Sequence, residues 1–97
     1  MEIAYSVNGV PIRLTPERWQ HIVENRDELA GRMDDVLYTI EQPDWVSKGY
    51  AGCLAAWKGF GRTQYLVVLY RELSRNDAFV VTAFFASKPR KGQKIWP

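Results

Sequence analysis

Two nearly continuous hydrophobic runs, YLVVLY at residues 65–70 and FVVTAFF at residues 79–85, most constrain how this chain can fold. Both runs are rich in β-branched and aromatic residues, which favour strands. A strand that is apolar on both faces must be covered on both faces, so we expect both runs in the middle of a sheet. The sequence LSRND between them is typical of a hairpin turn, which makes the two strands antiparallel neighbours.

The other strands are predicted from the turn residues that bound them. From residue 48 onward, glycine, aromatic and β-branched residues predict three strands, near residues 50–58, 64–72 and 77–86. Near the N-terminus, Asn8-Gly9 lies between two short strand-like runs, near 3–7 and 10–14, and predicts a tight hairpin. Pro11 has no backbone N–H, so we expect the second strand of this hairpin at a sheet edge.

Two helices are predicted between the hairpin and the later strands. Thr15 is a favourable N-cap, and Pro16 suits the first turn of a helix. We expect the first helix to end at Gly31. Its apolar stripe at helical spacing consists of Trp19, Ile22, Val23, Leu29 and Ala30. The second carries Val36, Leu37 and Ile40, and Pro43 ends it.

These elements predict one domain over residues 1–97, of the α+β class. We expect an N-terminal β-hairpin, two helices and then a three-stranded antiparallel meander, with the helices packed on one face of the sheet. A chain of 97 residues can bury one modest core. The other face of the sheet is then available to solvent or to a ligand.

Several classes of function are disfavoured by composition. The formal net charge of +2 is too small to indicate a nucleic-acid partner by itself, so any basic site must be local. No apolar run approaches the roughly 20 residues of a membrane span, and no secretion signal is visible, so we expect a cytoplasmic protein without a membrane partner. With one cysteine, Cys53, and one histidine, His21, we expect no disulfide, metal centre or cofactor.

His21 lies on the first predicted helix, away from the centre of its apolar stripe. One interpretation is a solvated residue on the outside of the helix. The other is a working acid–base group, because histidine is the side chain whose ordinary pKa lies nearest neutrality.

Thr82 is a polar residue inside the apolar run FVVTAFF, and strict alternation places it on the same strand face as Val80 and Phe84. Its hydroxyl either bonds locally or is held on a rigid strand toward an anionic oxygen. Lys58, beside a glycine turn, and Arg71, at a strand end, are candidate cations for the same site.

Basic and aromatic residues collect mainly in the C-terminal half of the chain. Such residues can follow a phosphate backbone and stack on bases, although a solvated basic surface is the alternative. The candidate RNA-binding residues are Arg13, Arg62, Tyr65, Arg90, Lys91, Lys94 and Trp96.

Five segments, in their order and spacing, resemble the phage-associated nuclease-like domains grouped with barnase, EndoU, colicin and RelE folds (the BECR fold). They are IRLTPERWQHI, YTIEQPDWV, YLVVLYRE, AFVVTAFFAS and KGQKIW, and they span residues 12–96. The resemblance implies helices followed by an antiparallel sheet, and RNA cleavage without a metal. By position, it implies that His21 is the helix histidine, Thr82 the hydroxyl residue of the late strand, and Arg71 or Lys58 the strand cation.

The chain also departs from this family pattern at three positions. Arg26 and Asp27 stand where family members often carry a further histidine and a proline, and Phe84 stands where a tyrosine is common.

The resemblance implies a metal-independent ribonuclease, a toxin or a phage or mobile-element effector, in which a 2′-hydroxyl attacks the adjacent phosphate and leaves a 2′,3′-cyclic phosphate. RNA is the expected partner, together with an acidic antitoxin or immunity protein if the domain is a toxin. The alternatives are a catalytically inactive RNA- or protein-binding module on the same fold and a structural phage-derived protein. An enzyme predicts that His21, Thr82 and one of Arg71 or Lys58 converge in a cleft, whereas a binding module predicts a dispersed basic patch.

Overall fold

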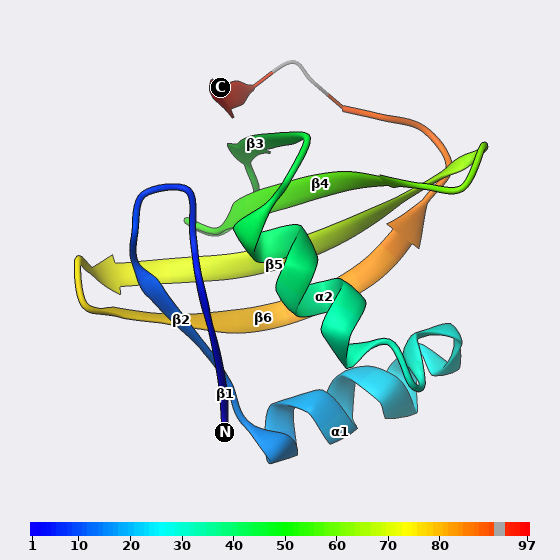
Figure 1. Cartoon of the computed structure of the whole chain (residues 1–97), viewed down its shortest axis with the longest axis horizontal. Coiled ribbons are helices and arrows are strands. Elements are labelled where there is room, and N and C mark those ends of the chain that lie inside the picture. The colour runs from blue at the N-terminus through cyan, green and yellow to red at the C-terminus, as the bar shows by residue number, and fades with distance from the viewer. Residues whose placement is uncertain (91–92) are drawn as a thin grey trace.

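The fold is given by a computed structural model that describes residues 1–90 and 93–97. Along the chain it contains β1 (Glu2–Tyr5), β2 (Pro11–Leu14), α1 (Pro16–Asn25), a 3₁₀ turn (Asp27–Leu29), α2 (Met33–Glu41), β3 (Trp45–Lys48), β4 (Leu54–Phe60), β5 (Gln64–Ser74), β6 (Asp77–Ala86) and β7 (Lys94–Trp96). Within the described residues, the strands form one seven-stranded sheet in the order β1-β2-β6-β5-β4-β3-β7 (Figure 1). The predicted α+β class is therefore confirmed.

The predicted set of strands was incomplete. The expected meander is present as β4, β5 and β6, but β3 pairs with β4 and β7 pairs with β3, so the sheet continues beyond it. On its other side, β2 pairs with β6 in parallel and joins the hairpin to the meander in one mixed sheet. The number and order of strands were therefore predicted wrongly, because short strands such as β3 and β7 are specified by their partners rather than by their own pattern.

Pro11 does not place β2 at the edge of the sheet, as we expected. β1 is the edge strand, and β2 lies between β1 and β6. Pro11 is the first residue of β2, and the pairing with β6 begins one residue later, at Ile12. The missing N–H therefore removes no bond to β6, and the first residue of a strand is a position where proline is tolerated.

The sheet buries side chains on both of its faces. One face carries the main core, which includes Tyr70 of β5, Ile22 of α1 and Val36 of α2. The opposite face carries a smaller cluster around Trp45 and Trp57, whose rings are stacked with centroids 5.3 Å apart. Both helices contribute to the main core. The opposite face, which carries the Trp45–Trp57 cluster and is called the second face below, is therefore the one left for other contacts.

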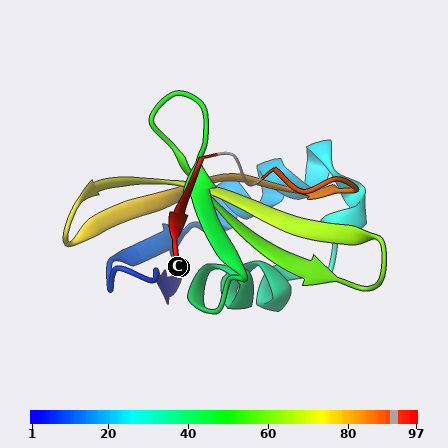
Figure 2. The ribbon, with the colours of Figure 1, turned by 90° about the horizontal axis from the view of Figure 1, so that it is seen from above.

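α1 lies beside the part of the β6 edge that β2 leaves unpaired. β2 pairs with β6 only at Ala78 and Phe79, although β6 continues to Ala86. The chain passes from β2 directly into α1, which packs against β6 (Figure 1). Because α1 lies beside this edge, one flank of the helix packs into the main core. The neighbouring flank reaches the opposite face of the sheet, which carries the Trp45–Trp57 cluster. The turn at residues 49–53 projects from the sheet on the side away from α2 (Figure 2).

The first helix is shorter than its apolar pattern predicts. It ends at Asn25, because Arg26 leaves the helical region with φ −141° and ψ 80°. The 3₁₀ turn that follows carries Leu29 into the main core, and Gly31, at φ 77°, turns the chain toward α2. In the described part of the chain, no helix has the length and apolar composition needed to cross a membrane.

Candidate functional site

The start of α1 fixes which of its side chains share a flank. Thr15 caps the helix, since its Oγ1 accepts a hydrogen bond from the backbone N–H of Arg18 at 3.1 Å. From this start, Arg18, His21 and Asn25 follow at spacings of three and four residues and lie on one flank. Ile22, the neighbour of His21, is buried in the main core. The same helix therefore anchors itself with one flank and presents polar groups with the next.

These polar groups line a pocket between α1 and β6. The pocket has a volume of about 480 Å³. It contains both His21 and Thr82, two residues that the sequence singled out independently. The full lining is Arg18, His21, Ile22, Asn25, Arg26, Tyr50, Val81 and Thr82.

A β-bulge in β6 presents Thr82 to this pocket. Leu69 of β5 pairs with Thr82, whereas the next residue, Tyr70, pairs with Val80, so Val81 is an extra residue in β6. Val80 packs in the main core, but Val81 and Thr82 both line the pocket on the second face. Strict alternation placed Thr82 on the face of Val80, and this expectation was wrong because a bulge shifts the alternation by one residue.

Two arginines bring positive charge to the pocket. The Nη1 of Arg18 donates a hydrogen bond to the carbonyl oxygen of the bulged Val81 at 3.4 Å. The guanidinium of Arg26 lies over the ring of Phe84, with its Cζ 5.3 Å from the ring centroid. Among residues 1–90 and 93–97, neither guanidinium is paired with a carboxylate. Both charges therefore remain available to an anionic group in the pocket.

Asn25 contacts both the backbone and the imidazole of His21. The Nδ2 of Asn25 donates a hydrogen bond to the backbone carbonyl of His21 at 2.9 Å, which turns the same nitrogen toward the imidazole. This Nδ2 lies 3.4 Å from Nε2 of His21. An amide nitrogen can only donate, so Nε2 of His21 is the acceptor in this contact. The contact is long and exposed, so a hydroxyl that enters the pocket can replace it.

A second, more apolar pocket adjoins the first on the same face. Its volume is about 650 Å³, and Tyr50 lines both pockets. Its floor is formed by β4 and β5, and cations stand at its rim. The full lining is Ser47, Lys48, Gly49, Tyr50, Ala55, Trp57, Val67, Leu69, Phe84, Arg90 and Gln93.

The structure does not bring the two predicted strand cations to His21. Nζ of Lys58 lies 3.6 Å from Oδ1 of Asp44 and 5.1 Å from the ring centroid of Tyr38, beside α2. Arg71 is exposed on β5 opposite Phe79 and is not part of the pocket lining. The cations that line the pocket are Arg18 and Arg26 instead, so the prediction of Lys58 or Arg71 beside His21 was wrong.

The predicted RNA-binding residues are dispersed, and among those that the structure describes only Arg90 lines either pocket. Arg13 forms an ion pair with Asp77 at 2.6 Å, and Tyr65 packs edge-on against the stacked tryptophans. Arg62 is exposed in the turn between β4 and β5, and Lys94 and Trp96 are exposed on β7. Lys91 lies outside the described residues.

Four polar or aromatic residues of the pocket lining were not predicted as site residues: Arg18, Asn25, Arg26 and Tyr50. Arg18 and Asn25 lie three residues before and four residues after His21, so helical spacing alone was a usable signal. Arg26 had been noted only as a departure from the family pattern. Nothing in the local sequence indicates that Tyr50 faces α1.

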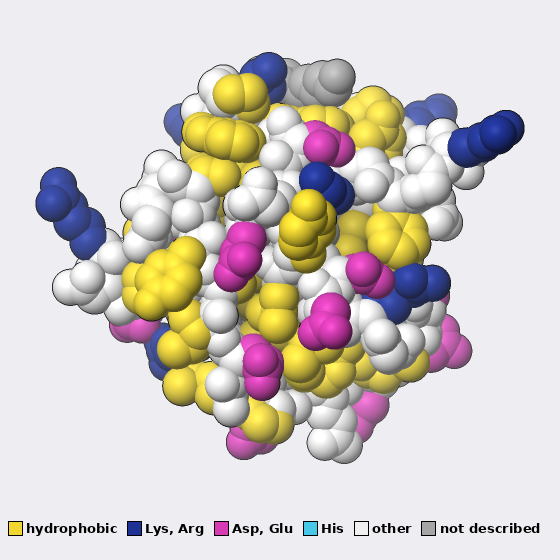
Figure 3. Space-filling view, in the orientation of Figure 1, with side chains coloured by type: hydrophobic (Ala, Val, Ile, Leu, Met, Phe, Trp, Pro, Cys, Tyr) yellow, Lys and Arg dark blue, Asp and Glu magenta, His cyan; other side chains and the backbone are white. Residues whose placement is uncertain are grey.

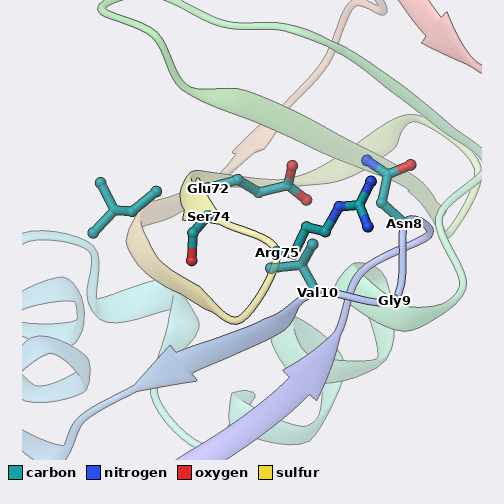
Figure 4. A pocket seen from close by; sticks show the side chains of 7 residues that line it. Asn8, Gly9, Val10, Glu72, Ser74 and Arg75 are labelled. Carbon is teal, nitrogen blue, oxygen red and sulfur yellow. The ribbon is translucent and has the colours of Figure 1, made fainter.

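A separate pocket of about 590 Å³ lies between two hairpin turns at another end of the sheet. Asn8, Glu72 and Arg75 are among its lining residues, and their side chains point toward one another in Figure 4. The carboxylate of Glu72 already accepts a hydrogen bond from the hydroxyl of Ser6 at 3.2 Å. This pocket contains none of the predicted catalytic residues, so the pocket beside α1 is the better candidate.

Comparisons of the chain with protein-family models, with curated proteins and with solved structures each give no match.

Proposed function

We propose that this chain is a metal-independent RNA endonuclease domain of the kind that its sequence resembles, the BECR-fold nucleases. The observation that carries the proposal is the convergence of His21, Thr82, Arg18 and Arg26 in one pocket. A base, a hydroxyl and two cations around one cavity are groups that can promote a phosphoryl-transfer reaction. The pocket adjoins an apolar one, so an RNA strand has room on both sides of a phosphate.

The reaction assigns a role to each of these groups. Nε2 of His21 accepts the proton of a ribose 2′-hydroxyl, and the 2′-oxygen forms a bond to the adjacent phosphorus. The bond between phosphorus and the 5′-oxygen of the next nucleotide breaks, and the departing oxygen takes a proton from solvent. The products are a 2′,3′-cyclic phosphate and a free 5′-hydroxyl. DNA is not a substrate, because it lacks the 2′-hydroxyl.

The positive charges supply the larger part of the rate acceleration. Arg18 and Arg26 face the phosphoryl oxygens as their negative charge grows, and Thr82 donates a hydrogen bond from a rigid strand. Loss of one such donor typically lowers kcat by about 10²- to 10³-fold. A single general base typically contributes about 10²- to 10⁴-fold.

The charge of the surface around the two pockets also suggests which kind of protein would bind and inhibit this domain if it is a toxin. Among residues 1–90 and 93–97, the linings of the two pockets include four cations, Arg18, Arg26, Lys48 and Arg90, and no carboxylate. If the domain acts as a toxin or phage effector, an acidic antitoxin or immunity protein that covers these cations would silence it by charge complementarity.

The test is cleavage of single-stranded RNA by the purified protein in EDTA, with identification of the product ends. We expect wild type to leave cyclic phosphates, His21→Ala to lose about 10²-fold or more of the rate, and Gln20→Ala to keep it. Gln20 is the matched control because it is exposed on the same helix but does not line the pocket. Equal rates for His21→Ala and wild type would overturn the assignment of the base. No cleavage by wild type would favour an inactive RNA- or protein-binding module.

A further inference from the structure

Tyr50 is held in an exposed position by a short, hydrogen-bonded turn. The backbone N–H of Gly49 donates to the carbonyl of Cys53 at 2.8 Å, and the N–H of Cys53 donates to the carbonyl of Tyr50 at 3.0 Å. Ala51 and Gly52 both have positive φ, at 55° and 77°. For Ala51, which has a Cβ, this left-handed conformation is unfavourable. A residue that is 66% exposed on such a constrained turn is placed there by the fold rather than left loose.

The position of Tyr50 divides the second face of the sheet into two compartments. On one side lies the pocket with His21, and on the other lies the apolar pocket that contains Trp57 and Phe84. Tyr50 lines both pockets, and the turn at residues 49–53 that carries it stands out from the sheet (Figure 2). The apolar pocket, at about 650 Å³, lies within the roughly 300–1,000 Å³ range of small-molecule sites.

The charges around the two pockets fit an anionic polymer rather than a peptide or a lipid tail. Arg18 and Arg26 line one pocket, and Lys48 and Arg90 line the other. In the part of the chain that the structure describes, no Asp or Glu lines either pocket. By contrast, acidic side chains are spread over the face that α2 covers (Figure 3). An apolar cavity between phosphate-binding cations matches a nucleotide whose base is buried while its phosphates stay at the rim.

We infer that Tyr50 stacks on an unpaired base of single-stranded RNA, and that this base occupies the apolar pocket next to the phosphate held by Arg18 and Arg26. The inference rests on the proposed function, because it names the substrate of the same site as single-stranded RNA. A base in an A-form duplex is paired and stacked, so it cannot enter a pocket in this way. Tyr50 therefore selects for loops, ends and other unpaired segments.

Binding without cleavage tests this inference separately from catalysis. The probes are fluorescently labelled 2′-O-methyl oligoadenylate and oligouridylate, which lack the attacking hydroxyl, and an abasic oligomer with the same number of phosphates. Fluorescence anisotropy gives the Kd of each probe. We expect Tyr50→Ala to weaken binding of the base-containing probes by about 5- to 150-fold, the range that one stacked base supplies. Tyr50→Phe keeps the ring and should bind like wild type.

Controls separate stacking from charge and from loss of fold. Tyr5→Ala removes another exposed tyrosine, 57% exposed on β1, which lines neither pocket, and it should bind like wild type. Tyr50→Ala and wild type should bind the abasic oligomer equally, because that oligomer has no base for Tyr50 to stack on. Full affinity of Tyr50→Ala for the base-containing probes would overturn the inference, as would equally tight binding of wild type to a duplex.

The outcomes also distinguish this inference from the proposed function. Single-stranded binding that depends on Tyr50, combined with no cleavage of natural RNA, would overturn the nuclease and leave the stacking site in place. Cleavage that depends on His21 but not on Tyr50 would support the nuclease and overturn the stacking site. Failure of wild type to bind any probe would overturn both.

Discussion

Tyr70 is the position where removal of one atom should stabilise this fold. Its side chain is fully buried in the main core. Within residues 1–90 and 93–97, its hydroxyl has no hydrogen-bond partner. A buried hydroxyl that loses its water without gaining a partner costs about 1–3 kcal/mol. Tyr70→Phe keeps the ring and leaves a space smaller than a methyl group, which costs less than about 1 kcal/mol. We therefore expect this substitution to raise the free energy of unfolding by about 1 kcal/mol.

Thermal unfolding followed by circular dichroism measures this change. For a domain of this size, about 1 kcal/mol corresponds to a rise in Tm of roughly 4–8 °C. Tyr5→Phe is the matched control, because Tyr5 is exposed and its hydroxyl is solvated in both states. A decrease of about 1 kcal/mol or more for Tyr70→Phe would refute the reasoning. It would mean that a buried water or another group bonds the hydroxyl in the folded protein.

Three further predictions follow from the same structure. Burial, aided by the charge of Glu72, raises the pKa of Tyr70 above its ordinary value of 10.0. Above about pH 10 the unfolded chain releases a proton that the folded protein keeps, so wild type should lose stability with rising pH more steeply than Tyr70→Phe in urea titrations. Ser47→Ala should lower the free energy of unfolding by about 1–3 kcal/mol, because the buried indole N–H of Trp57 loses its 3.1 Å bond to the Ser47 hydroxyl; a smaller loss in a Trp57→Phe background would confirm this cause, and an equal loss would contradict it. Arg26→Ala should slow RNA cleavage by about 10²- to 10³-fold, and an unchanged rate would show that its charge does not act on the phosphate.

The elements with strong local signals were predictable from the sequence. The cap at Thr15 and the proline after it set the start of α1 correctly, and the two long hydrophobic runs became β5 and β6 at the centre of the sheet. β3 and β7 were missed because they are short, and β7 is exposed throughout. Such short strands form because a neighbouring strand has unpaired backbone N–H and carbonyl groups. The local sequence of the short strand carries no signal for that neighbour.

The candidate site was predictable in part. His21 and Thr82 were identified from their chemistry and from the family resemblance, and the structure places both in one pocket. The cations beside them were not predicted, because the bulge at Val81 and the end of α1 at Arg26 decide which side chains reach the second face. Both features depend on contacts between distant parts of the chain, so neither produces a periodic pattern of hydrophobic residues in the sequence.

The pairing of β2 with β6 also governs when the pocket comes into existence. The two strands lie near opposite ends of the chain, and folding slows as the residues that must meet are farther apart in sequence. During synthesis the N-terminal segment emerges first, so α1 has no β6 edge to lie against until most of the chain has been made. A nascent chain therefore carries His21 long before Thr82 can join it. The order of synthesis itself therefore delays assembly of this pocket until β6 has joined the sheet.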